Sequence, residues 1–271
     1  MRIWYQSFVR QSLFGQYFNQ LGRMVAQAKE PGTVVDVHPI RQTGGLGKQH
    51  HYLEYLQMSE MLANVETANR EGYDAFVIGH FTDTGLYEAR EISRIPVIGL
   101  GQASMQMACL MGRHFSLIGL NRKSLSFIEE RAHLYGLASR MSASQTMSLK
   151  NPVVLDQALT EPDAMKLVLD DFMSAASKAE QAGAEVLIAA GGVAMATLNA
   201  ANINVTQGGA TILNGIAAAV TTTEMAIKMD RLTGGHFTSR ALHCAPPTRD
   251  ELPGIRQHYG EHAYRSIYPE E

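Results

Sequence analysis

The amino-acid sequence contains two similar halves, and this internal repeat constrains the fold more than any other feature. The segment 72–80 reads GYDAFVIGH and is echoed by GAEVLIAAG at 183–191, an offset of 111 residues. The segments that begin at Arg2 and Pro96 have counterparts 114 residues later, at Ser116 and Ala210. Because three strand-like segments match in the same order, we predict two similar folded units whose equivalent strand ends face one another across a cleft.

Short apolar runs alternate with longer amphipathic stretches along the chain, a pattern typical of buried parallel strands joined by crossover helices. Strands are expected at 3–5, 34–37, 75–78 and 97–99 in the first half, and at 116–118, 141–144, 186–188 and 211–213 in the second. Helices are expected at 52–70 and 163–182, each directly before an echoed strand, and at 216–232. The pattern indicates the α/β class.

The repeat also predicts the domain organisation. A chain of 271 residues suits two domains of about 100 to 150 residues each. The first crossing is expected at 113–114, and the chain returns after residue 215. We therefore expect a first lobe of 1–113 plus 216–271, with a C-terminal helix and an extended, proline-rich tail, and a second lobe of 114–215.

Composition excludes several classes of function. The formal net charge is −3, the isoelectric point is near 6.4, and no Lys/Arg cluster marks a phosphate track, so neither nucleic acid nor a membrane surface is an expected partner. Cys109 and Cys244 are the only cysteines, too few for a disulfide framework or a multi-cysteine zinc motif. We expect a cytoplasmic homo-oligomer, such as a dimer, that acts on a small molecule.

The sequence around each echoed strand is specific enough to compare with known families. In the first half DAFVIGHFTDTGL at 74–86 is followed by AREISRIPVIG at 89–99, and in the second half the segment 183–192 is followed by LNGIAAAV at 213–220. These segments resemble the aspartate/glutamate and hydantoin racemase superfamily over most of residues 1–235. The resemblance implies two pseudo-symmetric flavodoxin-like halves, an active site in the cleft between them, and catalysis without a metal or an organic cofactor.

The two catalytic cysteines of that family are replaced in this chain. When the residues on either side are aligned with the family, His80 takes the position of the first cysteine and Gly191 that of the second. A glycine side chain cannot carry a proton, so the resemblance argues against a two-cysteine mechanism here. An imidazole titrates near neutral pH and serves as a base, an acid or a nucleophile. We predict that His80, at the carboxyl end of a core strand, is the proton-transfer group.

Further site residues are predicted beside His80 and at the other strand ends. Thr82 is expected to donate to a substrate oxygen and Asp83 to orient the imidazole, although both are also typical turn and capping residues. Gly191 and Gly192 are predicted backbone donors to a carboxylate or an oxyanion. A glycine-rich segment, 42–48, is expected to form a mobile lid. The remaining candidates for substrate contact are Tyr5, Gln6, Ser7, His51, Phe81, Gln102, Ser104 and Asn214.

Several alternatives stay open from the sequence alone. No histidine pair has a recognised metal-ligand spacing, so no metal site is expected. Cys109 fits a buried apolar position, and Cys244 pairs with His243 as a nucleophile and base only if the tail folds back over the cleft. The favoured function is proton transfer through His80 on a small carboxylate or a cyclic amide such as a hydantoin or imide. The alternatives are a hydrolase, hydratase or lyase in which His80 activates water, and a non-catalytic small-molecule-binding protein.

Overall fold

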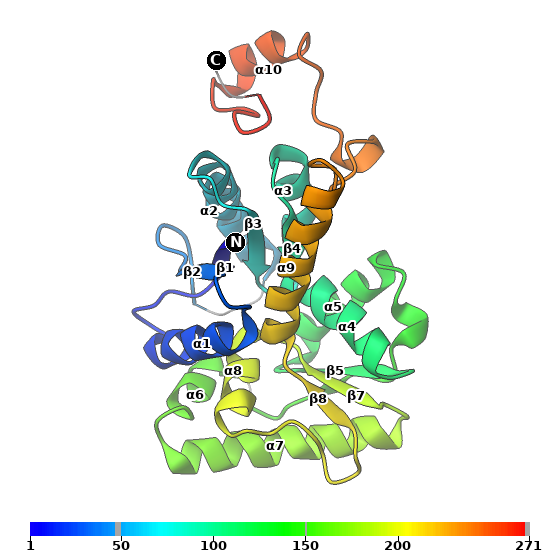
Figure 1. Cartoon of the computed structure of the whole chain (residues 1–271). Helices are drawn as coiled ribbons and strands as arrows, with labels where there is room; N and C mark the ends of the chain where they lie inside the picture. The colour runs from blue at the N-terminus through cyan, green and yellow to red at the C-terminus, as the bar shows by residue number, and fades with distance from the viewer. Residues whose placement is uncertain (47–49, 150, 269–271) are drawn as a thin grey trace.

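Two four-stranded parallel sheets form the centre of the protein (Figure 1). The computed structural model describes residues 1–46, 50–149 and 151–268. The first sheet has the order β2-β1-β3-β4, and the second has the equivalent order β6-β5-β7-β8. The strands are β1 (Arg2–Ser7), β2 (Val34–His38), β3 (Ala75–Gly79), β4 (Val97–Gly99), β5 (Phe115–Gly119), β6 (Gln145–Thr146), β7 (Val186–Ala189) and β8 (Thr211–Leu213). The predicted α/β class with two similar halves is confirmed.

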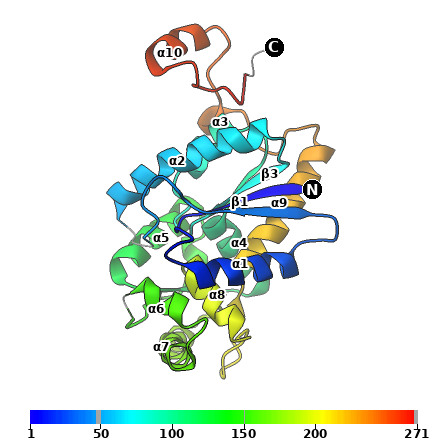
Figure 2. The ribbon, with the colours of Figure 1, turned by 90° about the vertical axis from the view of Figure 1, so that its left-hand side faces the viewer.

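Helices cover both faces of each sheet. In the first half, α2 and α3 lie on one face, and α1 and α9 lie on the other (Figure 2). The helices are α1 (Gly15–Ala28), α2 (His51–Arg70), α3 (Leu86–Ile92), α4 (Leu100–Met111), α5 (Arg122–Leu134), α6 (Pro152–Gln157), α7 (Pro162–Gln181), α8 (Gly192–Ala200), α9 (Gly215–Leu232) and α10 (Leu252–Tyr259). Two short 3₁₀ turns are η1 (Ala138–Arg140) and η2 (Leu242–Cys244).

The strand register places the ends of the inner strands at a common edge. Ser7 at the end of β1 pairs with Gly79 at the end of β3, and Ile118 of β5 pairs with Ala189 of β7. Because parallel strands end on the same side of a sheet, the turns that follow these four strands gather along one edge of each sheet. This arrangement positions the residues of the candidate site.

One hydrophobic core spans both halves. It includes the inner strands of both sheets, with Val77 of β3 and Leu187 of β7 fully buried. Helix α9 packs on β3 and β4 and against α1 and α4, so its apolar residues are buried with the first sheet although it follows the second in sequence. On this packing we propose that the lobe boundaries lie at 113–114 and 215–216.

Two parts of the chain differ from the prediction. The edge strand of the second sheet is β6 at 145–146 rather than 141–144, and Met141 forms only an isolated bridge with Phe115. The C-terminal tail, predicted to be extended, contains η2 and α10, which lies beyond α2 and α3 (Figure 1). Arg240 donates to main-chain carbonyls of Arg90 and Ser93 and thereby fastens the tail to the end of α3.

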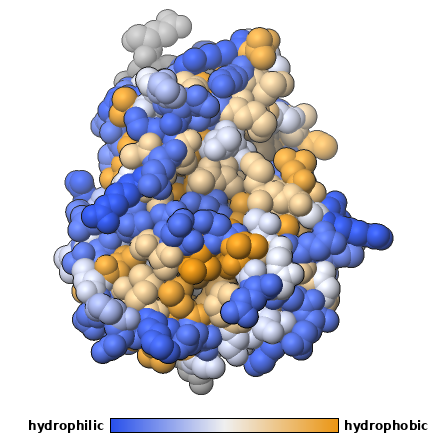
Figure 3. Space-filling model, turned by 60° about the horizontal axis from the view of Figure 1, so that its bottom comes forward, coloured by the Kyte–Doolittle hydropathy of each residue, from blue (hydrophilic) through white to orange (hydrophobic). Residues whose placement is uncertain are grey.

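The surface is predominantly hydrophilic around smaller apolar areas. The face shown in Figure 3 has apolar side chains gathered near its middle and hydrophilic side chains around them. None of the helices in the described part of the chain has both the length and the apolar character needed to cross a membrane.

The turn after β3 is held by a buried carboxylate. Asp83 accepts hydrogen bonds from the amides of Gly101 (2.9 Å) and Gln102 (2.6 Å) in the first turn of α4, and from the Tyr135 hydroxyl (2.7 Å). The partial positive charge of a helix N-terminus favours a carboxylate at this place. Glycine is required nearby, since a Cβ at Gly101 would stand 2.3 Å from the Phe81 carbonyl oxygen.

We predict opposite stability effects for two helical Gly→Ala substitutions. Gly101→Ala forces apart the β3 turn and α4, which we expect to cost about 2–3 kcal/mol of unfolding free energy. Gly22→Ala in α1 is the matched control, because its Cβ meets nothing within 4 Å and alanine favours a helix by about 0.5–1 kcal/mol. Urea denaturation followed by circular dichroism measures both. Equal effects of the two substitutions would contradict the close approach at Gly101.

Candidate active site

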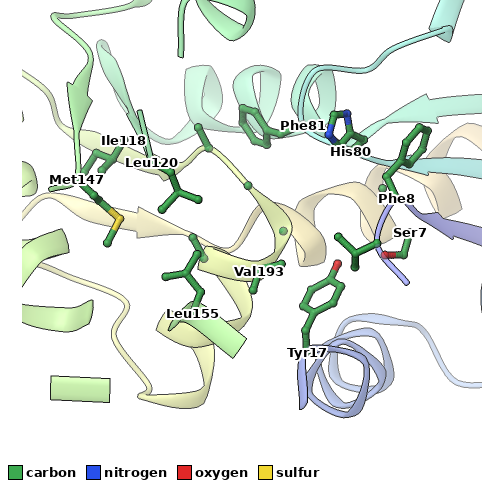
Figure 4. Close-up of a pocket in the computed structure, with 16 residues that line it drawn as sticks. Ser7, Phe8, Tyr17, His80, Phe81, Ile118, Leu120, Met147, Leu155 and Val193 are labelled. Atoms are coloured by element: carbon green, nitrogen blue, oxygen red, sulfur yellow. The ribbon is translucent and has the colours of Figure 1, made fainter. Parts of the chain in front are cut away.

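A pocket lies between the two lobes, at the carboxyl ends of the inner strands (Figure 4). The empty space of the pocket is about 700 Å³ when its open mouth is included. The lining consists of residues 7–9, 79–81 and 190–194, together with Tyr17, Ile118, Leu120, Met147 and Leu155. Among these lining residues no side chain is Lys, Arg, Asp or Glu. The pocket is therefore apolar, with a few groups able to form hydrogen bonds.

His80 enters the pocket from the turn after β3 (Figure 4). Its imidazole stacks on the Phe8 ring, with 4.9 Å between centroids and 25° between planes. The Nδ1 atom lies 2.6 Å from Thr82 Oγ1. Burial lowers the pKa of His80, and the nearby Glu54 carboxylate opposes this by raising it. The net direction is downward, so the ring is neutral at physiological pH.

A buried carboxylate stands behind Thr82. Glu54 of α2 is 4% exposed, and its Oε2 accepts from Thr82 Oγ1 (3.2 Å) and Thr84 Oγ1 (2.7 Å). The two hydroxyls lie 2.8 Å apart. Because a carboxylate only accepts and Thr82 has one proton, the contacts of Thr82 with both the imidazole and Glu54 Oε2 are satisfied when His80 Nδ1–H donates to Thr82. The other ring nitrogen, Nε2, is then left with its lone pair and available as a base.

The second lobe contributes main-chain groups rather than ionisable side chains. Gly191 has extended backbone (φ 170°) and precedes the first turn of α8, which lines the pocket through Gly192, Val193 and Ala194. The first amides of a helix have no intrahelical partner and attract negatively charged oxygen atoms. This turn is suited to hold a carbonyl oxygen on which negative charge develops.

Tyr17 and Leu155 line the pocket although the sequence did not identify them. Tyr17 comes from α1 and Leu155 from α6. The Tyr17 side chain is 2% exposed and points its hydroxyl into the pocket (Figure 4). In the sequence Tyr17 is one of several aromatic residues on the apolar face of an amphipathic helix, so no signal separates it from the core residues.

The structure brings five of the predicted site residues together in the pocket: Ser7, His80, Phe81, Gly191 and Gly192. Thr82 contacts the imidazole from behind rather than the pocket itself. Asp83 was expected to orient the imidazole, but its carboxylate bonds to α4 and Tyr135, and the contact with His80 Nδ1 comes from Thr82.

The other predicted substrate contacts are not among the residues that line the pocket. Tyr5 is fully buried, and its hydroxyl has no hydrogen-bond partner among the described residues. Four of the others bond to protein groups: Gln6 to Trp4 and Asn64, Gln102 to Arg90, Ser104 to the Leu100 carbonyl, and Asn214 to the Ala217 amide. His51 stacks on Phe127 with 3.8 Å between ring centroids. Their roles toward a substrate stay predictions.

The described part of the predicted lid and the C-terminal tail do not line the pocket. In the lid segment 42–48, the Glu60 carboxylate accepts from the amides of Gln42 and Thr43, while Gly47 and Lys48 lie outside the described residues. His243 and Cys244 are in η2 beside α3 and do not line the pocket. Within the described ranges, no group of three or more His, Cys, Asp or Glu side chains is arranged to hold a metal ion.

Comparison with known proteins places this architecture among racemases. The protein-family model described as Asp/Glu/Hydantoin racemase matches residues 16–223. A hydantoin racemase from Rhizobium meliloti is 33% identical over 196 residues, covering 72% of this chain and 75% of that protein. A hydantoin racemase from Pseudomonas sp. (strain NS671) is 25% identical over 233 residues, covering 86% and 87%.

Solved structures share the fold at lower sequence identity. An allantoin racemase from Klebsiella pneumoniae superimposes with a TM-score of 0.75 at 22% identity, over 92% of this chain and 94% of that one. An allantoin racemase from Pseudomonas fluorescens gives a TM-score of 0.76 at 20% identity, over 91% and 97%. Both confirm the two-lobed α/β architecture.

We predict that the titration of His80 depends on Glu54. In the wild type, the His80 pKa is expected below that of an exposed histidine, because burial disfavours the imidazolium. Glu54→Gln removes the carboxylate that raises this pKa, so the midpoint should fall further. Glu88→Gln, an exposed carboxylate on α3, is the control and should leave it unchanged. Side-chain NMR of labelled histidines measures the three midpoints, and a rise in Glu54→Gln would contradict the assignment.

Proposed function

Since this chain belongs to the Asp/Glu/hydantoin racemase family, we propose that it is an isomerase that moves the α-proton of a small cyclic amide, such as a hydantoin- or imide-like ring. The observation that carries this proposal is the pairing of a neutral, half-buried His80 with an apolar pocket whose described lining has no charged side chain. The curated relatives that act on hydantoins, at 25–33% identity, support the same substrate class.

The lining of the pocket favours an uncharged ring over a dicarboxylate. Burying a carboxylate is costly unless a cation or several donors compensate it, and the lining offers no Lys or Arg side chain. A hydantoin or imide ring presents N–H and C=O groups, which suit the Ser7 hydroxyl and the main chain at the start of α8. Apolar residues such as Phe8, Leu120 and Met147 suit a hydrophobic ring substituent.

In the proposed reaction His80 begins as the base. Its neutral Nε2 takes the proton from the ring carbon next to a carbonyl, and the electron pair of that bond moves onto the carbonyl oxygen. Amides at the start of α8 stabilise this oxygen. The imidazolium that forms is stabilised by Glu54 through Thr82, since a negative charge behind the ring favours the protonated state. Return of a proton to the opposite face completes the inversion.

Replacement of His80 by Ala tests the proposed function directly. We expect wild-type protein in heavy water to incorporate deuterium at C5 of 5-substituted hydantoins without opening the ring. Proton NMR measures this exchange as loss of the C5 proton signal. His80→Ala should reduce this exchange by about 10²–10⁴-fold, the usual contribution of a positioned base, while circular dichroism shows an unchanged fold. Ring-opened product would support a hydrolase instead. Ligand binding that survives His80→Ala, with no product from either protein, would support a binding protein.

We further propose that turnover requires neither a metal ion nor an organic cofactor, because the base, the oxyanion donors and the apolar enclosure all come from the chain itself. Dialysis against EDTA should then leave the rate of deuterium exchange unchanged. The control is readdition of Zn²⁺ or Mg²⁺ to the dialysed protein. A loss of activity that one of these ions restores would contradict this part of the proposal.

A further inference from the structure

The pocket lacks an ionisable side chain at the position that mirrors His80. Inversion at carbon requires one group to remove a proton and another to supply one on the opposite face. Gly191, the counterpart of His80 in the repeat, has no side chain to do this. Among the described residues of the lining, only Ser7, Tyr17 and His80 carry an exchangeable side-chain proton. The second group must come from this set if it is a side chain.

We propose that the Tyr17 hydroxyl is the second proton-transfer group, which donates to the face of the substrate opposite His80. This inference rests on the proposed function. The Tyr17 hydroxyl reaches the pocket from α1, and His80 reaches it from the turn after β3 on the other side (Figure 4). A Cβ at Gly192 would stand 2.9 Å from the Tyr17 Oη atom. The phenol therefore lies directly against the Gly191–Gly192 turn. A side chain at position 192 would occupy the space that the Tyr17 hydroxyl fills.

The surroundings of Tyr17 suit an acid rather than a base. Burial raises the pKa of Tyr17 to about 12, while a hydrogen bond to Ser7 lowers it in part. The phenol is therefore protonated at neutral pH and ready to donate. Ser7 is the weaker candidate, because an aliphatic alcohol is a far weaker acid than a phenol. Its hydroxyl instead can donate to the Tyr17 oxygen and stabilise the phenolate that is left after transfer.

The proton balance of the reaction closes within the pocket. His80 takes the proton of the ring C–H bond, and that electron pair passes into the enolate. The enolate carbon then uses the pair to form a new C–H bond with the Tyr17 proton on the opposite face. This leaves an imidazolium and a phenolate. Water in the open mouth of the pocket takes a proton from His80 and gives one to Tyr17, and both groups return to their neutral state.

Tyr17→Phe in heavy water separates this role from a structural one. Each enantiomer of 5-methylhydantoin, 5-benzylhydantoin and allantoin is incubated separately, and deuterium incorporation and optical purity are followed together. We expect the wild type to exchange and invert both enantiomers, because the enantiomer whose proton faces Tyr17 reacts from the imidazolium–phenolate pair in the reverse of the step above. Tyr17→Phe should lose inversion by about 10²-fold or more, yet still incorporate deuterium with retention into the one enantiomer whose proton faces His80. His80→Ala should lose exchange of that same enantiomer.

The control is Tyr259→Phe, which removes an exposed hydroxyl (75% exposed) in α10 and should match the wild type. Wild-type inversion by Tyr17→Phe, or equal loss of exchange for both enantiomers, would overturn the inference. Equal loss would instead assign Tyr17 to holding the substrate or the fold. If the wild type exchanges the α-proton of neither enantiomer of any of these compounds, the proposed function falls and this inference with it. A failure confined to Tyr17→Phe leaves the proposed function standing.

Discussion

The carboxylate of Asp83 joins three parts of the molecule, and the position of His80 depends on it. It binds the first amides of α4 and the hydroxyl of Tyr135, which follows α5 of the second lobe, while its own backbone lies in the left-handed region (φ 49°). Burial raises the pKa of Asp83 to about 6, against the lowering effect of these three donors. The same turn carries His80 three residues earlier. The lobes are thus connected through the segment that presents the imidazole.

The charged group of the site, the Glu54 carboxylate, lies behind the residues that line the pocket. The pocket itself is neutral and apolar, and the Glu54 carboxylate reaches it only through Thr82 and the imidazole. An apolar lining keeps the resting imidazole uncharged, because burial disfavours its protonated form, and the carboxylate behind it moderates the cost of protonation. A site with these properties suits transient charge that appears during a reaction better than a substrate that is already charged.

The two lobes share a sheet order but divide the chemistry unequally. The first lobe supplies His80, Thr82, Glu54 and Tyr17, whereas the second supplies the main chain at the start of α8 and apolar side chains. A duplicated scaffold places equivalent strand ends opposite one another, but it does not require equivalent residues there. A glycine opposite a histidine leaves room, and Tyr17 from a neighbouring helix lies against that turn. The two halves are therefore similar in their strand order but not in the residues that they place in the pocket.

The sequence by itself determined the α/β class, the repeated order of strands and the turns that meet at the pocket. Hydrophobic periodicity can be recognised locally in the sequence. In a parallel sheet the order of the strands then places the turns after their carboxyl ends along one edge. The sequence placed Ser7, His80, Phe81, Gly191 and Gly192 in one pocket for the same reason. It failed at β6, where a two-residue edge strand has too few ladder bonds for local propensity to fix its register. Only the tertiary structure decided that Glu54, Tyr17 and Leu155 join the site and that the tail packs on α3. Each of these placements depends on how a helix or segment is rotated and packed against elements distant in sequence. Side-chain contacts across the whole core determine that packing.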